Sequence, residues 1–374
     1  MSENTLRTAR TQARVLAINP GTTSTKIGLW TRTSEVFAHT IRHGDEEVQR
    51  FQGRPMLDRL QYRAGRMEAA LEEAGLLNAG GLEGLAGVAG RGGFLGPMDC
   101  GTYLVNDAMI EVLRQARGGE HASNLGAPLA LRFARRAGVE AYVVDPVTVD
   151  EWQPCARRTG SPLVERTSIG HWLNTKAVAK RFARERGRPY AELRLVVAHM
   201  GSGVTVSAHR GGRVIDSNSI EEGPFGPDRT GSLPARALAR LCFSGAMSGP
   251  EVDRHLFGDG GLFAWLGTRD LMEVERRIEA GDARAAAVFE AMVYQIAKET
   301  GAMAAVLHGK VDAVLLTGGM AHSAPVLAQL RPQIEWIAPV TVYPGEDELR
   351  ALAEGVFRVL DGEEEAREFA AGLA

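Results

Sequence analysis

The chain has 374 residues, 44% of them hydrophobic, and a formal net charge of −3. This length predicts two domains with a core in each, whereas the slightly acidic balance argues against a nucleic-acid-binding protein, which needs a basic surface. No apolar run approaches the ~20 residues that span a bilayer, so no membrane partner is expected.

The terminus and the cysteines indicate the compartment. Residues 1–13 are polar and lack the apolar centre of a signal peptide, so they are expected to form a disordered extension. Cys100, Cys155 and Cys242 are odd in number and widely spaced, which favours neither a disulfide framework nor a CxxC metal site. A cytoplasmic location is the expectation.

Residues 15–30 predict a strand, a polar turn and a returning strand, with residues 36–42 as a third antiparallel strand. Glycine in the turn lets the backbone approach a ligand, and short polar side chains with one lysine could hold a polyanion. An ordinary polar hairpin explains the same pattern equally well. The candidate ligand-binding residues of this turn are Asn19, Gly21, Thr22, Thr23, Ser24 and Lys26.

Two later strands end in polar residues. A helix over residues 54–74 precedes a strand near residues 85–89 that runs into Arg91, flanked by glycines, and a strand over residues 139–144 ends at Asp145. The carboxyl end of a strand is where an open α/β sheet binds ligands. Arg91 could instead cap loop carbonyls, and Asp before Pro is a common turn.

Residues 195–209 repeat the opening stretch half a chain later. Asn19 falls on His199, Gly21 on Gly201, Thr22 on Ser202 and Thr25 on Thr205, all at an offset of 180. This predicts an internal repeat of one loop type, and hence a pseudo-twofold molecule with nucleotide held between its lobes. The second loop contributes Gly201, Ser202 and Gly203 as candidate phosphate-binding residues.

The remaining chain predicts helices over 175–186 and 283–307, an insertion of short helices over 232–280 and a terminal helix after 343–350. A strand within 311–321 ends at Gly318 and Gly319, where the backbone can approach adenosine or phosphate. The acidic cluster 346–348 either favours a helix N-terminus or faces a metal.

Five ordered segments, NPGTTSTKIG (19–28), AHMGSG (198–203), GPFGPDRTG (223–231), LTGGMA (316–321) and PGEDE (344–348), together resemble the butyrate kinases of the acetokinase family. That family belongs to the actin, Hsp70 and sugar kinase superfamily. The resemblance covers roughly residues 14–362. It implies an α/β protein with the two-lobed, actin-like (ribonuclease H-like) ATPase fold, each lobe a mixed five-stranded sheet with helices, binding ATP/ADP and Mg²⁺ in a homodimer or larger assembly.

The resemblance also implies roles. Asn19 should contact the transferring or terminal phosphate, Arg91 and Arg229 the acyl carboxylate and the γ-phosphoryl oxygens, and His171 and His199 the developing charge. Asp145 and Glu348 should hold Mg²⁺ through water. Further nucleotide contacts are expected from Gly318, Gly319 and Met320.

The expected activity is reversible, in-line phosphorylation of a short-chain fatty acid by ATP. Gly93 and Gly170 are small where larger residues are expected, and Ser202 stands where butyrate kinases have glycine. The small Gly93 and Gly170 suggest a roomy acyl pocket and a preference for butyrate or branched C4–C5 acids, whereas Ser202 suggests that the second loop holds phosphate somewhat differently. The roles of Asp150, His209 and Gly170 stay open.

Three alternatives remain. Acetate or propionate could be the acid; an actin- or Hsp70-like ATP-dependent binding module shares the fold; and a sugar kinase would need a carboxylate base, for which Asp150 is the suggestive candidate. The expected division is an N-terminal lobe over 14–165 with the acyl and phosphate site and a C-terminal lobe over 166–374 with the adenosine site. In this division the terminal helix could pack back on the N-terminal lobe.

Overall fold

The computed structural model describes residues 13–78, 81–82 and 84–370; the extension expected over residues 1–13 lies almost wholly outside them. The chain forms two compact units. The first unit comprises Met1–Val149 and Asp347–Ala374, and the second comprises Asp150–Glu346. The boundary therefore falls after Val149 instead of residue 165, and the terminal segment belongs to the first unit.

The first unit is built on a seven-stranded mixed sheet in the order β14-β7-β8-β6-β1-β2-β3. β1, β2 and β3 form the antiparallel meander expected from the sequence, and β6 and β8 run parallel to β1. The strands are β1 (Arg14–Pro20), β2 (Ser24–Trp30), β3 (Glu35–Arg42), β6 (Leu85–Arg91), β7 (Thr102–Leu104), β8 (Ala141–Val144) and β14 (Arg367–Glu368), with β4 (Leu77–Asn78) and β5 (Gly81–Leu82) as a separate pair.

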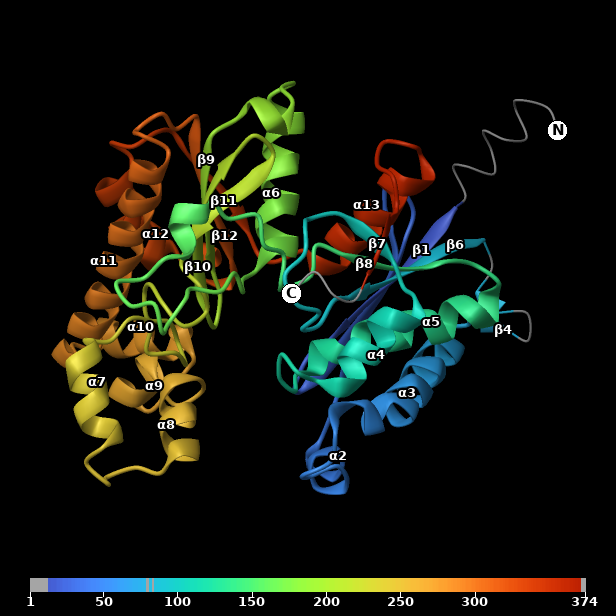
Figure 1. The fold of residues 1–374 in the computed structure, drawn as a ribbon, viewed down its shortest axis with the longest axis horizontal. Helices are drawn as coiled ribbons and strands as arrows, with labels where there is room; N and C mark the ends of the chain where they lie inside the picture. The colour runs from blue at the N-terminus through green and yellow to red at the C-terminus, as the bar shows by residue number, and fades with distance from the viewer. Residues whose placement is uncertain (1–12, 79–80, 83, 371–374) are drawn as a thin grey trace. The chain divides into compact units, whose positions relative to one another are not determined.

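Helices cover both faces of this sheet (Figure 1). On one face, side chains of α3 and α5 pack with Leu16, Ile18 and Ile27 in a continuous core; on the other, α13 lies against β1, β2, β6 and β8. The helices are α2 (Asp45–Arg50), α3 (Leu60–Glu73), α4 (Asp107–Gln115), α5 (Gly126–Ala137) and α13 (Glu348–Leu360), with 3₁₀ turns η1 (Met56–Arg59) and η2 (Ala122–Leu125).

The second unit has a five-stranded mixed sheet in the order β11-β10-β9-β12-β13. α6 covers one face, and α11 and α12 lie side by side over the other (Figure 1). The main elements are α6 (Trp172–Glu185), β9 (Leu195–Met200), β10 (Val204–Arg210), β11 (Arg213–Ser217), α11 (Ala283–Val306), β12 (Ala313–Gly318), α12 (Ala324–Ile334) and β13 (Val340–Pro344). Short 3₁₀ turns are η3 (Pro154–Arg157), η4 (Tyr190–Glu192) and η5 (Gly319–His322).

The two sheets share one strand order. Read from β3, the first sheet runs β3-β2-β1-β6-β8, and the second runs β11-β10-β9-β12-β13, an antiparallel meander followed by two parallel strands in both. The repeat inferred from two loops thus extends to the whole sheet. The expectation of five strands per lobe is correct for the second unit and wrong for the first, where the short strands β7 and β14 extend the edge.

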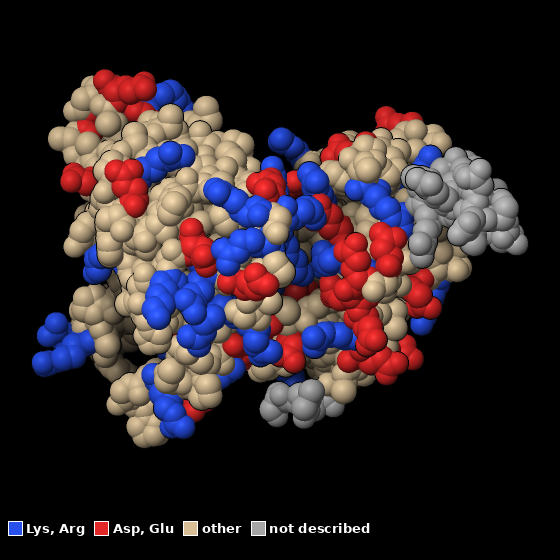
Figure 2. Space-filling model, turned by 90° about the horizontal axis from the view of Figure 1, so that it is seen from above, with Lys and Arg blue, Asp and Glu red and all other residues tan. Residues whose placement is uncertain are grey.

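The insertion expected over residues 232–280 consists of α7 (Ala235–Cys242), α8 (Gly249–Leu256), α9 (Gly261–Leu266) and α10 (Leu271–Glu279). α7 and α8 bury no residue, and Phe243 is 91% exposed. Acidic and basic side chains both occur on the face shown in Figure 2, without one continuous basic surface. None of the helices in the described ranges is long and apolar enough to cross a membrane.

Gly318 and Gly319 offer a matched test of the close approach between β12 and β9. Gly318 has φ +89°, and a Cβ there would lie 2.4 Å from the Met200 carbonyl oxygen, whereas a Cβ at Gly319 would meet no atom within 4 Å. We expect Gly318→Ala to lower the free energy of unfolding by about 2–4 kcal/mol and Gly319→Ala to change it little. Urea denaturation measures both; equal effects would contradict this account.

Candidate active site

Three predicted residues of the first unit come together at the carboxyl edge of its sheet. Ile18 of β1 pairs with Gly90 of β6, and Arg91 of β6 pairs with Val144 of β8. Asn19, Arg91 and Asp145 therefore stand on neighbouring strands at one edge, the location that the topology of such sheets favours for ligands.

Glu348, at the start of α13, links two of these side chains. Arg91 Nη1 lies 3.0 Å from both carboxylate oxygens of Glu348, and the Asn19 side-chain amide donates to the same carboxylate. Arg91 Nη1 also lies 3.4 Å from Asn19 Oδ1. Within the described residues the side-chain hydrogen bonds of Arg91 all run through Nη1, so its Nε–Nη2 edge is the part that could receive a second carboxylate in bidentate fashion.

Asp145 is 3% exposed and has φ +38°, a left-handed conformation that short polar residues tolerate. Its Oδ1 accepts from the Gly101 amide, 2.9 Å away, which fixes the carboxylate. The described residues hold no group of three or more His, Cys, Asp or Glu side chains that could bind a metal. The separate carboxylates of Asp145 and Glu348 can still suit Mg²⁺, because this ion keeps several waters and binds substrate phosphates.

The first loop places its polar groups on a surface. Thr22 and Thr23 are exposed, Gly21 and Ser24 half-buried, and the Gly21 amide donates to the Ser24 carbonyl at 2.7 Å, closing the turn. Lys26 pairs with Asn19 across β1 and β2. Directly paired residues of antiparallel strands share a face, so the Lys26 charge lies on the same side of the sheet as Asn19.

The predicted histidines of the second unit stack on each other. The rings of His171 and His199 are 4.0 Å apart and inclined by 13°. His171 Nδ1 lies 2.8 Å from Thr205 Oγ1, and His199 Nδ1 lies 2.8 Å from Asn174 Oδ1. His199 is fully buried at the end of β9, whereas His171 is half-buried at the start of α6.

Asn174 and Glu346 orient His199. The Asn174 amide nitrogen donates to the Glu346 backbone carbonyl at 2.6 Å, so the Asn174 oxygen faces His199 and accepts from Nδ1. The other ring nitrogen, Nε2, lies 3.7 Å from Glu346 Oε1.

Arg229 lies directly against the second loop. A Cβ on Gly203 would be 2.6 Å from Arg229 Nη1, and a Cβ on Gly226 would be 2.7 Å from the Ser202 carbonyl oxygen. The loop of residues 223–231 therefore packs on the loop of residues 201–203 only because both carry glycine. Burial lowers the pKa of Arg229, and the neighbouring Asp228 opposes that shift.

Gly318 ends β12 beside β9, where Thr317 pairs with His199, and Gly319 begins the 3₁₀ turn η5. Gly319 is exposed, whereas the Met320 side chain is 4% exposed and belongs to the core of the second unit. Any contact of Met320 with a nucleotide would therefore use its backbone.

The repeat is imperfect beyond the turns. Pro20 pairs with Thr25 around the first loop, but Met200 pairs with Val204 around the second. The second turn is thus one residue shorter, and His199 pairs with Thr205 where Asn19 pairs with Lys26. The equivalence of Thr25 with Thr205 taken from the offset is wrong, because a shift of one residue moves a side chain to the other face.

The space beside the two glycines that suggested a roomy acyl pocket is occupied. A Cβ on Gly93 would lie 2.2 Å from Asn124 Oδ1, and one on Gly170 would lie 2.7 Å from the Trp172 ring. Neighbouring side chains occupy the space that these glycines leave. The inference of extra room at Gly93 and Gly170 is therefore wrong.

Two residues whose roles stayed open have structural partners. Asp150 forms an ion pair with Arg157. His209 is fully buried, with Tyr190 Oη 2.7 Å from Nδ1 and Ser207 Oγ 2.8 Å from Nε2. Burial and, to a smaller extent, the charge of Lys176 lower the pKa of His209 to about 3 against the opposing effect of Glu151.

Sequence reasoning missed a buried set beneath the first loop, namely Arg63, Glu47 and His43. No local pattern marked these residues, because Arg63 lies inside a segment read only by its apolar spacing.

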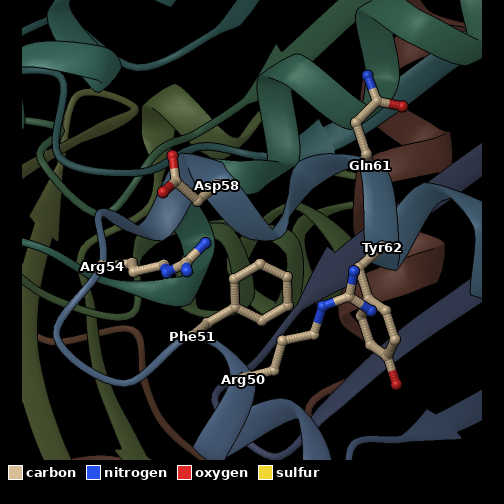
Figure 3. Close-up of a pocket in the computed structure, with 6 residues that line it drawn as sticks. All are labelled: Arg50, Phe51, Arg54, Asp58, Gln61 and Tyr62. Atoms are coloured by element: carbon tan, nitrogen blue, oxygen red, sulfur yellow. The ribbon is translucent and has the colours of Figure 1, made fainter.

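A cavity of about 520 Å³ opens nearby (Figure 3). Its lining contains none of the predicted site residues and consists of Arg50, Phe51, Arg54, Asp58, Gln61 and Tyr62.

Comparison with known proteins finds a family that resembles part of the chain. Residues 167–335, which include His171, His199 and Arg229, match the acetokinase family. This match covers a little under half of the chain and lies within the second unit.

Solved structures of acetate and propionate kinases are similar in fold over nearly the whole chain. The acetate kinase of Porphyromonas gingivalis is 17% identical, with 92% of this chain and 99% of that one covered and a TM-score of 0.73. A propionate kinase from Francisella tularensis is 16% identical (91% and 98% covered, TM-score 0.72), and the acetate kinase of Entamoeba histolytica 15% (93% and 100%, TM-score 0.74). The actin-like ATPase fold expected from the sequence is confirmed.

The buried His209 predicts acid sensitivity. Its pKa falls from 6.5 in the unfolded chain to about 3 in the folded one, so the unfolded state binds more protons between these values. The stability that the neutral His209 ring contributes is complete above pH 6.5 and is lost as the pH falls toward 3. The loss reaches about 3 kcal/mol at pH 4. We expect His209→Gln to flatten the pH dependence of the unfolding free energy.

Urea denaturation from pH 7 to pH 4 measures this difference. Glu151 and Lys176, whose charges act on His209, are present in both proteins. His39→Gln, at an exposed position of β3, is the control and should keep the slope of the unsubstituted protein. An unchanged slope in His209→Gln would show that its ring is not held neutral.

Proposed function

We propose that this protein transfers the γ-phosphoryl group of ATP to a short-chain fatty acid, reversibly and in line, to give an acyl phosphate and ADP. The acetokinase-family match over residues 167–335 carries the proposal. The edge of the first sheet supports it, because Arg91 there is fixed by Glu348 through one nitrogen only.

The acceptor chemistry fits these residues. A carboxylate is already ionised near neutral pH, so its phosphorylation needs positioning and charge neutralisation and no general base. Arg91 would hold the acyl carboxylate, Asn19 and Lys26 the terminal phosphate, and Arg229 with His171 and His199 the charge that develops on the phosphoryl oxygens. The loops around Gly201–Gly203 and Gly318–Gly319 would cover phosphates and adenosine through their backbones.

Mg²⁺ would be held through water by Asp145 and, at longer range, by Glu348. When bound, the ion neutralises phosphate charge. The Asp145 carboxylate is oriented by the Gly101 amide, and the contacts of Glu348 with Arg91 and Asn19 limit it to an indirect role.

Butyrate or a branched C4–C5 acid is our proposed substrate, on the strength of the five butyrate kinase-like segments. The names of the similar solved structures favour acetate or propionate instead. Because Gly93 and Gly170 leave no empty space, they no longer support a larger acid. A homodimer or larger assembly also stays a prediction, for sedimentation velocity to test. The exposed Phe243, between α7 and α8, would suit such an interface.

Two other functions are less favoured. A sugar kinase needs a free carboxylate base near its hydroxyl acceptor, but Asp150 is paired with Arg157. An ATP-dependent binding module has no use for a carboxylate-binding arginine beside its phosphate loop. The family match and Arg91 together favour the acid kinase.

The activity is tested by trapping acyl phosphate as hydroxamate, with Mg²⁺, ATP and acetate, propionate, butyrate, isobutyrate or isovalerate. We expect product with at least one acid and the highest kcat/KM with a C4–C5 acid. Each buried methylene discriminates by only about 1–3 kcal/mol, so the preference should be graded. Acetate as the best substrate would reject the butyrate proposal alone; ATP turnover without hydroxamate for every acid would reject the kinase.

Arg229→Ala should lower kcat about 10²–10³-fold, because a donor to the developing phosphoryl charge is removed. Arg229→Lys keeps the charge without the planar fork, so we expect an intermediate loss. Arg276→Ala, at an exposed position of α10, is the matched control and should retain activity. Circular dichroism checks that each variant is folded; near-normal turnover in Arg229→Ala would exclude the assigned role.

A further inference from the structure

The first phosphate loop is held from beneath by a buried arginine that the proposed mechanism does not use. Arg63 of α3 is 0% exposed. Its Nη1 donates to the Gly21 carbonyl at 2.7 Å and its Nη2 to the Thr22 carbonyl at 3.3 Å, while Nε donates to Glu47 Oε1 at 2.8 Å. One planar guanidinium thus binds two successive loop carbonyls and one carboxylate.

These hydrogen bonds determine the direction of the backbone amides in the loop. In a trans peptide the carbonyl of one residue and the N–H of the next point in opposite directions. With the Gly21 and Thr22 carbonyls turned toward Arg63, the amides of Thr22 and Thr23 are turned away from it. Among the backbone hydrogen bonds of the described residues, neither amide has a partner, and both residues are exposed.

The amides are turned toward the side of the sheet that carries the site. Thr25, Ile27 and Leu29 alternate along β2 on the face that packs on α3, so Asn19 and Lys26 belong to the opposite face, that of Glu348 and α13. Two successive outward amides form the kind of backbone concavity that binds anions. Arg63 also neutralises the negative ends of the two peptide dipoles behind it.

Glu47 and His43 hold Arg63 in place. The Glu47 side chain is 1% exposed, and its second oxygen lies 2.7 Å from His43 Nδ1. His43 Nε2 lies 2.8 Å from Thr25 Oγ1 in β2. Burial, with the charge of Arg63, lowers the pKa of His43 to about 4 despite the opposing effect of Glu47. A neutral ring facing a carboxylate carries its proton on Nδ1, so Nε2 accepts from the threonine hydroxyl.

We propose that Arg63, held by Glu47, is a positioning residue that fixes the Gly21–Ser24 loop with the amides of Thr22 and Thr23 directed at the terminal phosphate of ATP. This rests on the proposed function for the identity of the ligand. Arg63 itself touches no substrate and acts through the loop. The competing view is that Arg63 only stabilises the contact between α3 and the sheet.

The two views differ in how they treat ATP and ADP. A residue that positions the terminal-phosphate loop should affect a triphosphate and spare a diphosphate, whereas a loss of general stability should weaken both. Arg63→Lys retains a charge for Glu47, but its single ammonium cannot replace the fork on two carbonyls. The double variant Arg63→Met with Glu47→Gln removes both charges and leaves no lone buried carboxylate.

Titration calorimetry with Mg²⁺ and either AMP-PNP or ADP is the test. We expect AMP-PNP to bind about 10–100-fold more weakly to both variants, the range for losing charge-assisted support, and ADP to bind within about twofold of the unsubstituted protein. Arg132→Met breaks the Arg132–Glu68 ion pair between α5 and α3, 3.2 Å long and remote from the loop carbonyls, and should change neither affinity.

Unchanged AMP-PNP binding, or equal loss of AMP-PNP and ADP, would overturn the positioning role. If the double variant fails to fold by circular dichroism, Arg63→Lys decides. If the unsubstituted protein binds AMP-PNP but phosphorylates no acid, the proposed function fails while this comparison still stands. If it binds neither nucleotide, both proposals fall.

Discussion

The buried carboxylate of Glu348 is the contact on which the first half of the site depends. A buried charge must be paired and hydrogen-bonded, and Glu348 meets this requirement through Arg91 and Asn19. The three residues come from α13, β6 and β1. This contact therefore ties the start of the terminal helix to the carboxyl edge of the sheet, which explains why α13 packs on the first unit although it follows the second in sequence.

The same short segment serves both units with different chemistry. Glu346 belongs to the second unit and lies near His199, whereas Glu348 belongs to the first and binds Asn19. Asn19 and His199 end corresponding strands of sheets with one strand order. The side chain at this position is an amide in the first unit and an imidazole in the second. The repeat thus keeps a polar side chain at the same place in both sheets and changes its chemistry.

Local patterns in the sequence were sufficient for the strands, the hairpins and the residues at their ends, because turn residues and alternating side chains report on neighbours in the chain. They were insufficient wherever a side chain distant in the sequence determines the packing or the strand pairing. Asn124 fills the space above Gly93, Trp172 fills that beside Gly170, and the shorter second turn shifts the pairing of Thr205. Arg63 was missed for the same reason, since its carbonyl partners lie on another element.

Arg91 illustrates why an internal carboxylate need not compete with an external one. A guanidinium can bind carboxylates along more than one edge, and Glu348 contacts Nη1 alone. Holding this nitrogen fixes the plane of the group and removes rotamer freedom before any ligand arrives. A substrate carboxylate that takes the Nε–Nη2 edge then meets an arginine already oriented, so less entropy is lost on binding. In this view, Glu348 acts as a permanent ligand of Arg91 that presets its remaining edge.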